Sequence, residues 1–344
     1  MANGQFENVS APFNTRLLAP LIAGQLQTIL QIATPDALVT LNIAALLMLA
    51  IALSLYLTKQ GCHPLSVIPL LCVPYLFTLY QFIYVPDLFA VSVCGIALIG
   101  LLYGGLRGMG IAVIFTILAI LTRPSLAVLF GVAVLLLAID KRWWSATMII
   151  GATIIGYLAV SKLTANFDTN AHQLNSSLYM VLKIPVNIAR NYLGLNIATD
   201  ATAHYCPTPM FLFDTSRWPL MGNIQSVRIC YPNWIHALNT IGNLALIIGI
   251  WPWLALRRVP FRTLVKNWRP HAYLFPILLF LLMGPMLGLT VQRLFLYAFV
   301  VYLIALPHLI TTIGVQNSPI RYCIIAGATN IVGIAHLIWL SPDS

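Results

Sequence analysis

The chain has 344 residues, of which 60% are hydrophobic and only 8% are charged. Soluble domains carry about 25% charged residues, so this composition excludes an ordinary soluble enzyme or binding module. The net charge of +10 does not require a nucleic-acid partner, because the short cytoplasmic loops of polytopic membrane proteins collect Lys and Arg.

Apolar runs long enough to cross a hydrocarbon core predict an all-α polytopic bundle of about ten transmembrane helices. We expect one transmembrane domain over residues 1–344. Residues 1–36 are too polar to span and form an exoplasmic or interfacial segment. Within it, Arg16 to Ala33 places apolar residues between glutamines in helical rhythm, which predicts an amphipathic helix lying in the interface.

Six spans are expected before the chain becomes polar, and four after it. The polar stretch, residues 163–233, contains helical fragments such as 178–195 but no span, and is predicted to be one large exoplasmic loop. The expected spans are about 37–58, 65–84, the two arms of a hairpin between 84 and 125, 125–139, a sixth ending near 162, and then 234–256, 271–291, 293–313 and 320–340.

Basic residues give the expected orientation. The short connections on one side contain only Arg123 and Arg293, whereas the other side receives ten basic residues and is therefore predicted to be cytoplasmic. Seven of the eight acidic residues fall on the outer side. Acidic residues contribute little to membrane topology, so this clustering instead fits an outward-facing polar site. The cytoplasmic set comprises Lys59, Arg107, Lys141, Arg142, Arg257, Arg258, Arg262, Lys266, Arg269 and Arg321.

The hairpin between Tyr84 and Ser125 organises the chain. It enters the membrane beside Asp87, turns in a Gly-rich loop that contains Arg107, and returns beside Arg123. A carboxylate and a guanidinium at the same mouth of a hairpin are candidates for chemistry, because ionisable groups at the membrane are costly. The plainer interpretation is that both are ordinary interface residues, since helix ends often carry a charge.

Four outward-facing features are expected to converge on one face of the membrane. An arginine fork matches phosphate oxygens, and a carboxylate can act as a general base or hold a sugar or a metal ion. Together they suit a substrate with an apolar tail and a phosphate at the interface. The alternative is that each arginine snorkels to the headgroups. The four features are Arg16 with Pro20, Asp87 with Tyr84, Arg123, and Gln292 with Arg293. Asp87 is the catalytic candidate, and the substrate-binding candidates are Arg123, Arg293, Arg16, Tyr84 and Gln292.

The cysteines suggest a disulfide and no metal site. Cys206 and Cys230 both lie in the long loop, where an oxidising compartment favours a bond, and its closure would stabilise the loop by about 3 kcal/mol. The Cys and His spacings match no metal site, so neither metal nor cofactor is expected.

Several short motifs resemble bacterial membrane proteins related to the GT-C glycosyltransferases, which take sugars from polyprenyl-phosphate carriers. The stretches Gly4-Gln5-Phe6 and Ala11 to Pro20 resemble their first outer loop. Asp87 resembles their second acidic position, Leu121-Thr122-Arg123-Pro124 their basic position, and Gln292-Arg293-Leu294-Phe295 a late outer arginine. The resemblance covers most of the chain in layout and implies a multi-pass protein of the bacterial inner membrane.

One departure from that family concerns the beginning of the chain. There, a transmembrane span and an acidic residue assigned as the base precede the Gly-Gln-Phe stretch. Here Met1 stands only three residues before Gly4. The chain is therefore expected either to be truncated or to lack that part, with Glu7 as the only acid of the opening segment.

The leading hypothesis is a membrane glycosyltransferase that uses a polyprenyl-phosphate-linked sugar, or another lipid-linked substrate, on the exoplasmic face. One alternative is a transporter or flippase for a lipid-linked or small polar solute, which predicts internal repeats and paired broken helices. Another is a non-catalytic membrane assembly subunit. All three place the chain in a lipid bilayer with no nucleic-acid partner.

Overall fold

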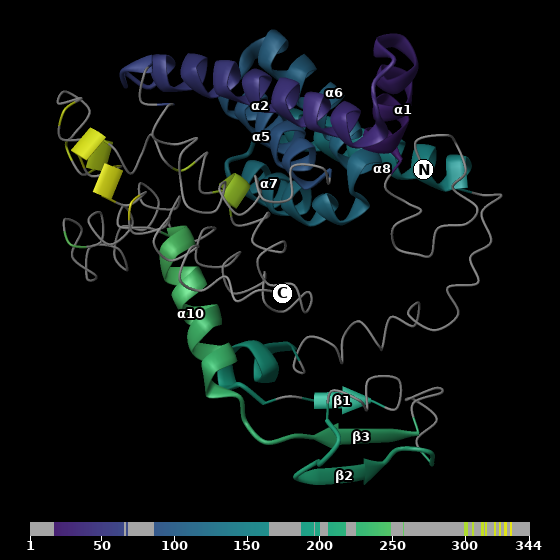
Figure 1. Ribbon diagram of the computed structural model, residues 1–344. Coiled ribbons are helices and arrows are strands. Elements are labelled where there is room, and N and C mark those ends of the chain that lie inside the picture. Colours follow the sequence, from purple (N-terminus) through teal and green to yellow (C-terminus); the bar gives the residue numbers. More distant parts are fainter. Residues whose placement is uncertain are drawn as a thin grey trace.

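The computed structural model describes residues 17–64, 86–164, 187–195, 197–199, 206–217 and 225–248, with isolated positions at 67, 257 and between 299 and 331. The described part is mostly helical (Figure 1). Three of its helices are long and apolar enough to cross a membrane: α2 (Thr34–Lys59), α6 (Gly105–Thr122) and α8 (Trp143–Thr164). They support the prediction of a helical membrane protein.

Shorter apolar helices complete the bundle: α1 (Leu18–Leu30), α5 (Asp87–Tyr103) and α7 (Ala127–Ile139), which follows a 3-10 turn at Pro124–Leu126. Their bounds lie close to those expected from the sequence. The predicted spans at 65–84, 271–291, 293–313 and 320–340 lie wholly or largely outside the described residues.

Local residues explain where these helices end. Gly104 and Gly105 both have positive φ angles, of 74° and 67°, a conformation that glycine adopts without steric cost. They make the tight turn between α5 and α6. Pro124 ends α6, because the residue before a proline is disfavoured in helical conformation; Arg123 is accordingly extended, with φ −155° and ψ 98°.

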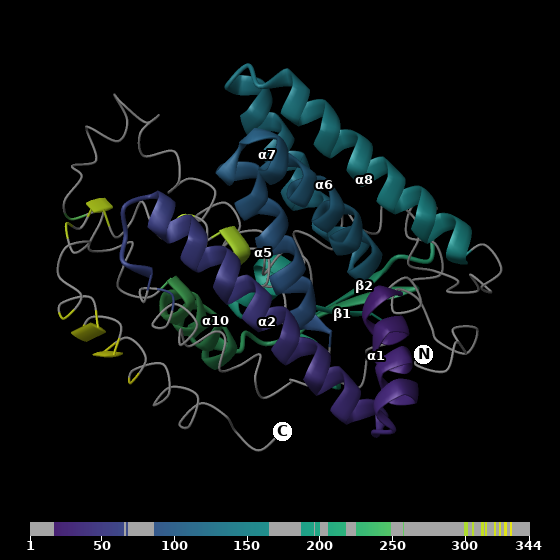
Figure 2. The ribbon, with the colours of Figure 1, turned by 90° about the horizontal axis from the view of Figure 1, so that it is seen from above.

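Helix α5 is the centre of the bundle. Every residue from Asp87 to Leu101 is buried, as expected of a helix that is apolar on all sides. Figure 2 shows α5 between α2 and α6, with α8 on the other side of α6. The beginning of α5 is therefore also enclosed, which matters for the polar groups placed there.

Two contacts show that α2 and α5 run in the same direction. The Asn42 side chain of α2 contacts the first turn of α5. At the other end, the Lys59 ammonium donates a hydrogen bond to the Tyr103 carbonyl oxygen and lies 4.1 Å from the centre of the Tyr103 ring. Helix α6 then runs back toward the beginning of α5.

The two ends of the bundle differ in charge. Asp87 and Arg123 lie at one end, here named the Asp87 end. Lys59 lies at the opposite end, as does Arg107 in the first turn of α6. Lys141 and Arg142 follow α7, which runs away from the Asp87 end and packs against α8. Lys162, in the last turn of α8, belongs to the Asp87 end, because Tyr157 of the same helix contacts Pro124. The excess of basic residues at the Lys59 end is the distribution that the positive-inside rule expects.

The 163–233 stretch contains an element that the sequence analysis did not predict. A three-stranded antiparallel sheet is formed by β1 (Ile197–Thr199), β2 (Phe211–Asp214) and β3 (Ser226–Ile229), in the order β1-β3-β2. Strands of three or four residues are too short to give an alternating pattern that stands out from the surrounding sequence. The all-α class therefore describes the bundle but not this loop.

A second compact region joins a short helix at 187–193 to α10 (Trp234–Ile248). The Asn233 side-chain oxygen caps α10 by accepting from the His236 backbone N–H at 3.2 Å. The Asn233 N–H donates to the Gly194 carbonyl oxygen at 2.7 Å. Gly194 has φ +68°, and a Cβ there would lie 2.5 Å from the Asn233 backbone carbonyl oxygen. Only glycine therefore allows the two segments to approach this closely.

Candidate functional site

Asp87 and Arg123, two of the predicted site residues, form an ion pair. Arg123 Nη1 donates to Asp87 Oδ1 at 3.0 Å, and their side chains are only 10% and 3% exposed. Asp87 is the first residue of α5 and Arg123 directly follows α6. Because the two helices are 17 and 18 residues long and join through a tight turn, the beginning of one lies beside the end of the other.

Both charges are placed at the favourable end of a helix dipole. An acidic residue is stabilised at a helix N-terminus and a basic residue at a C-terminus, each by about 0.3–1 kcal/mol at exposed sites. Asp87 occupies the first turn of α5, and Arg123 is the C-cap of α6. These dipoles offset part of the cost of removing the two charges from water, which otherwise weighs against a buried pair.

Asn42 supports the beginning of α5. Its side chain is fully buried, and its Oδ1 accepts a hydrogen bond from the Phe89 backbone N–H at 2.9 Å. The first N–H groups of a helix have no partner within that helix, and α5 has no N-cap side chain of its own. Helix α2 therefore supplies the cap two residues from Asp87, a role that the sequence analysis missed.

Replacing Asn42 by Ala is expected to destabilise the protein by about 1–3 kcal/mol, because a buried backbone donor loses its partner. The thermal midpoint of the purified protein in detergent would measure this loss. Thr40→Ala is the matched control, since the exposed Thr40 hydroxyl bonds only to the Asp36 carbonyl oxygen one turn earlier. Equal midpoints for the two variants would contradict the cap.

Two further contacts fix the chain around Arg123. The Leu17 backbone N–H donates to the Leu121 carbonyl oxygen at 3.2 Å, so the beginning of the described chain lies at the end of α6. The Tyr157 hydroxyl of α8 donates to the Pro124 carbonyl oxygen at 2.9 Å. Neither contact could be predicted from the sequence, because each joins segments far apart in the chain.

The other predicted substrate-binding residues cannot be placed. Arg16, Tyr84, Gln292 and Arg293 lie outside the described residues. Arg16 directly precedes Leu17, whose backbone reaches the end of α6. Of the residues expected to converge on one face, the structure therefore describes only Asp87 and Arg123.

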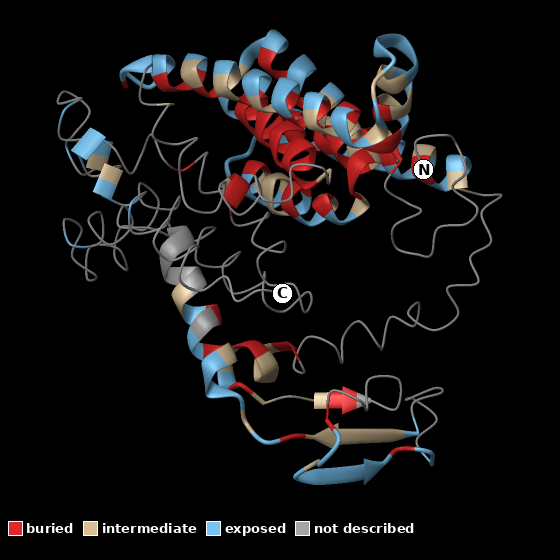
Figure 3. Cartoon of the chain, in the orientation of Figure 1, coloured by how far each residue is buried: buried red, intermediate tan, exposed pale blue. Residues whose placement is uncertain are grey.

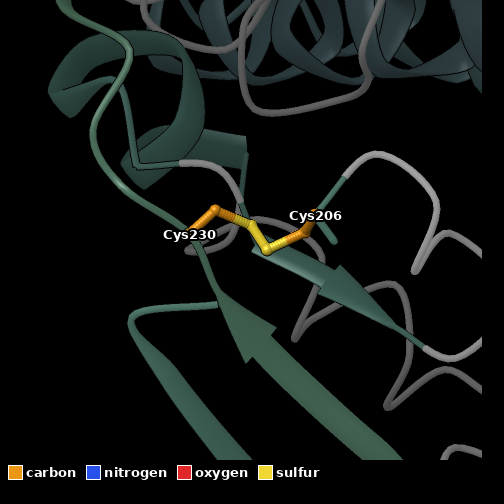
Figure 4. The surroundings of a disulfide bond; sticks show 2 residues. All are labelled: Cys206 and Cys230. Atoms are coloured by element: carbon orange, nitrogen blue, oxygen red, sulfur yellow. A yellow bond between two sulfur atoms is a disulfide. The ribbon is translucent and has the colours of Figure 1, made fainter. Parts of the chain in front are cut away.

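The structure joins Cys206 and Cys230 by a disulfide, with their Cα atoms 5.9 Å apart. Both cysteines are buried and form a small apolar cluster with Ala198 of β1. Figure 4 shows the bond beside the strands, with Cys230 directly after β3. The bond therefore ties the two ends of the chain segment that carries β2 and β3.

Loss of this bond through Cys206→Ser is expected to destabilise the loop by about 3 kcal/mol. In the unsubstituted protein from an oxidising compartment, mass spectrometry after alkylation without reductant should find Cys206 and Cys230 unmodified. Cys323, which is free and exposed, should be modified in the same sample. Alkylation of all three cysteines would contradict the bond.

Two titratable groups in the loop also reflect its folding. Burial raises the pKa of Tyr192 to about 12, so this residue of the short helix remains a neutral phenol. Hydrogen bonds from the Ser216 hydroxyl and backbone N–H lower the pKa of Asp214, so this carboxylate remains negative at neutral pH.

Comparisons of the whole chain with protein-family models, curated proteins and solved structures find no match.

Proposed function

We propose that the chain is a membrane glycosyltransferase-like protein that uses a polyprenyl-phosphate-linked sugar on the exoplasmic face of a bacterial inner membrane. The observation that supports this proposal is the buried Asp87–Arg123 pair at one end of an apolar bundle. Ionisable groups in such a setting are rare and costly, and are a functional hypothesis by default.

In this proposal Arg123 binds the carrier phosphate. A guanidinium presents five N–H donors in a fixed fork, so one arginine can hold a carboxylate and a phosphate oxygen at the same time. Arg293 and Arg16 would add positive charge, with Gln292 and Tyr84 as polar partners.

Asp87 would orient the sugar or assist the base that activates the acceptor. Its contact with Arg123 and the cap that Asn42 provides to α5 fix its position. One positioned acid–base group contributes about 10²–10⁴-fold to a rate. The polyprenyl tail would lie in the bilayer against exposed apolar side chains of the bundle, such as Leu47, Ile51 and Ile114.

Proteoliposomes that contain the full chain and a polyprenyl-phosphate sugar, tritiated in the sugar, test the proposal when a panel of water-soluble hydroxyl acceptors is added. We expect the labelled sugar to move to an acceptor oxygen, with the phosphate left on the polyprenyl chain, so that the label leaves the lipid fraction with time. Asp87→Asn should slow this transfer about 10²-fold or more. Asp36→Asn, which changes an exposed acid in the first turn of α2, should leave the rate unchanged.

Other outcomes distinguish the alternatives. If the labelled lipid crosses the bilayer with its sugar still attached, the chain is a flippase and the enzyme proposal is wrong. If the lipid is neither cleaved nor moved across a panel of hexose and pentose carriers, a non-catalytic assembly subunit becomes the remaining hypothesis.

A further inference from the structure

The two faces of the small sheet differ in chemistry. Successive side chains of a strand point to opposite faces, and residues paired across strands share a face. Ile229 pairs with both Ile197 and Phe211, and Val227 pairs with Phe213. These five apolar residues therefore occupy one face, here named the aromatic face. The rings of Phe211 and Phe213 lie 6.4 Å apart between centroids.

The opposite face carries the internal contacts of the loop. Arg228 pairs in register with Ala198 on one side and Leu212 on the other, and Ser226 pairs with Asp214. Ala198 is buried together with Cys206 and Cys230. The disulfide thus packs against this opposite face, so the aromatic face is turned away from this small core.

The aromatic face is substantially exposed. Phe211 and Phe213 are 51% and 50% exposed, and Figure 3 shows β2 exposed along its length at the edge of the sheet. Exposed aromatic residues on an edge strand favour aggregation in water, and contiguous apolar patches mark interaction sites. A covering surface is therefore needed.

Exposed apolar residues also follow the sheet along the chain, in α10, which leaves the sheet through residues 230–233 (Figure 1). Tyr231, just before the helix, is exposed. Within α10, Trp234, Leu238 and Ile241 are exposed, and their spacing of i, i+4 and i+7 places them in one stripe along the helix. Tyr and Trp are the residues enriched where membrane proteins meet the headgroups.

We propose that the aromatic face of the sheet rests on the surface of the lipid bilayer, with the Phe211 and Phe213 rings at the boundary between headgroups and acyl chains. The bundle holds the chain in the bilayer, so lipid is always within reach of this loop. The charges favour anionic headgroups: apart from Arg228 and Asp214, which lie on the opposite face, the described residues between 187 and 233 include Arg190 and Arg217 and no acid.

Leu212 and Phe213 provide a matched pair for the test. They are neighbours on β2, 61% and 50% exposed, and point to opposite faces. Each is replaced by Cys and spin-labelled in a full chain that keeps the disulfide but has Cys62, Cys72, Cys94 and Cys323 replaced by Ser. In vesicles of phosphatidylcholine and phosphatidylglycerol, oxygen should collide more often than a water-soluble nickel complex with the label at 213. The order should reverse at 212.

Two results would overturn the proposal. Equal access of the nickel complex to both labels would place the aromatic face in water. Protection of the label at 213 from both oxygen and nickel would mean that protein, such as a second copy of the chain, covers the face.

A second measurement needs no substitution in the chain. Phosphatidylcholine with a photoreactive group in its acyl chain should form adducts on the peptide that contains Phe211 and Phe213 of the unsubstituted protein. Lack of adducts there, with adducts present on peptides of α2, would also contradict the proposal.

Discussion

Replacing Asp87 by Asn is expected to lower the thermal midpoint of the purified protein strongly, because it leaves the Arg123 guanidinium buried without its counter-charge. Breaking a buried ion pair by removing one partner costs about 3–5 kcal/mol. Both side chains of this pair are nearly inaccessible to water, so solvent cannot compensate the charge that remains. Asp36→Asn, at an exposed position of α2, should shift the midpoint little.

A double-mutant cycle separates the pair from the individual side chains. Removing both charges through Asp87→Asn with Arg123→Met should cost less than the sum of the two single changes, because no uncompensated charge remains. Unfolding in detergent at fixed pH gives the four values. If the two single effects simply add, the ion pair is not what couples the beginning of α5 to the end of α6.

Replacing Gly108 by Ala is expected to disrupt the α5–α6 hairpin. A Cβ at this position would lie 2.6 Å from the Gly100 carbonyl oxygen, and a backbone atom cannot move aside as a flexible side chain can. The two helices must separate, and overpacking of this kind costs about 1–3 kcal/mol or more. The separation would also displace the ends of the helices, where Asp87 meets Arg123.

Gly110→Ala is the matched control for this change. It lies on the same helix, but a Cβ there has no heavy atom within 4 Å. Alanine should stabilise α6 at this position by up to about 1 kcal/mol through its higher helix propensity. Opposite shifts of the thermal midpoint are therefore expected for the two variants. Shifts of the same sign and size would contradict the close approach of α5 and α6.

The helix bounds and the position of the ion pair could be predicted because local features determine them. Gly104 and Gly105 allow the turn, Pro124 ends the returning helix, and the apolar runs between them are similar in length. Once a hairpin with equal arms is recognised, Asp87 and Arg123 must lie at the same end. The proximity of these two residues thus follows from the geometry of the hairpin alone.

The rest of the site could not be predicted because it depends on contacts between distant segments. Asn42 appears in the sequence as a single polar residue within a long apolar run, and only the packing of α2 on α5 reveals its role as a cap. Tyr157 reaches Pro124 in the same way. The sheet was missed because its strand pairing depends on residues brought together by the fold and by the Cys206–Cys230 bond.

Binding of a polyprenyl phosphate to Arg123 is the most direct test of the proposed site. Equilibrium binding of the tritiated lipid to the full chain in detergent should be saturable, and Arg123→Lys should raise Kd about tenfold or more, equivalent to 1.4 kcal/mol. Lysine keeps the charge but lacks the planar fork that holds two phosphate oxygens. Arg142→Lys, an exposed change near the opposite end of the bundle, should leave Kd unchanged. A weaker affinity of Arg123→Lys alone is the expected result; equal affinities for the unsubstituted chain, Arg123→Lys and Arg142→Lys would contradict a phosphate site at Arg123.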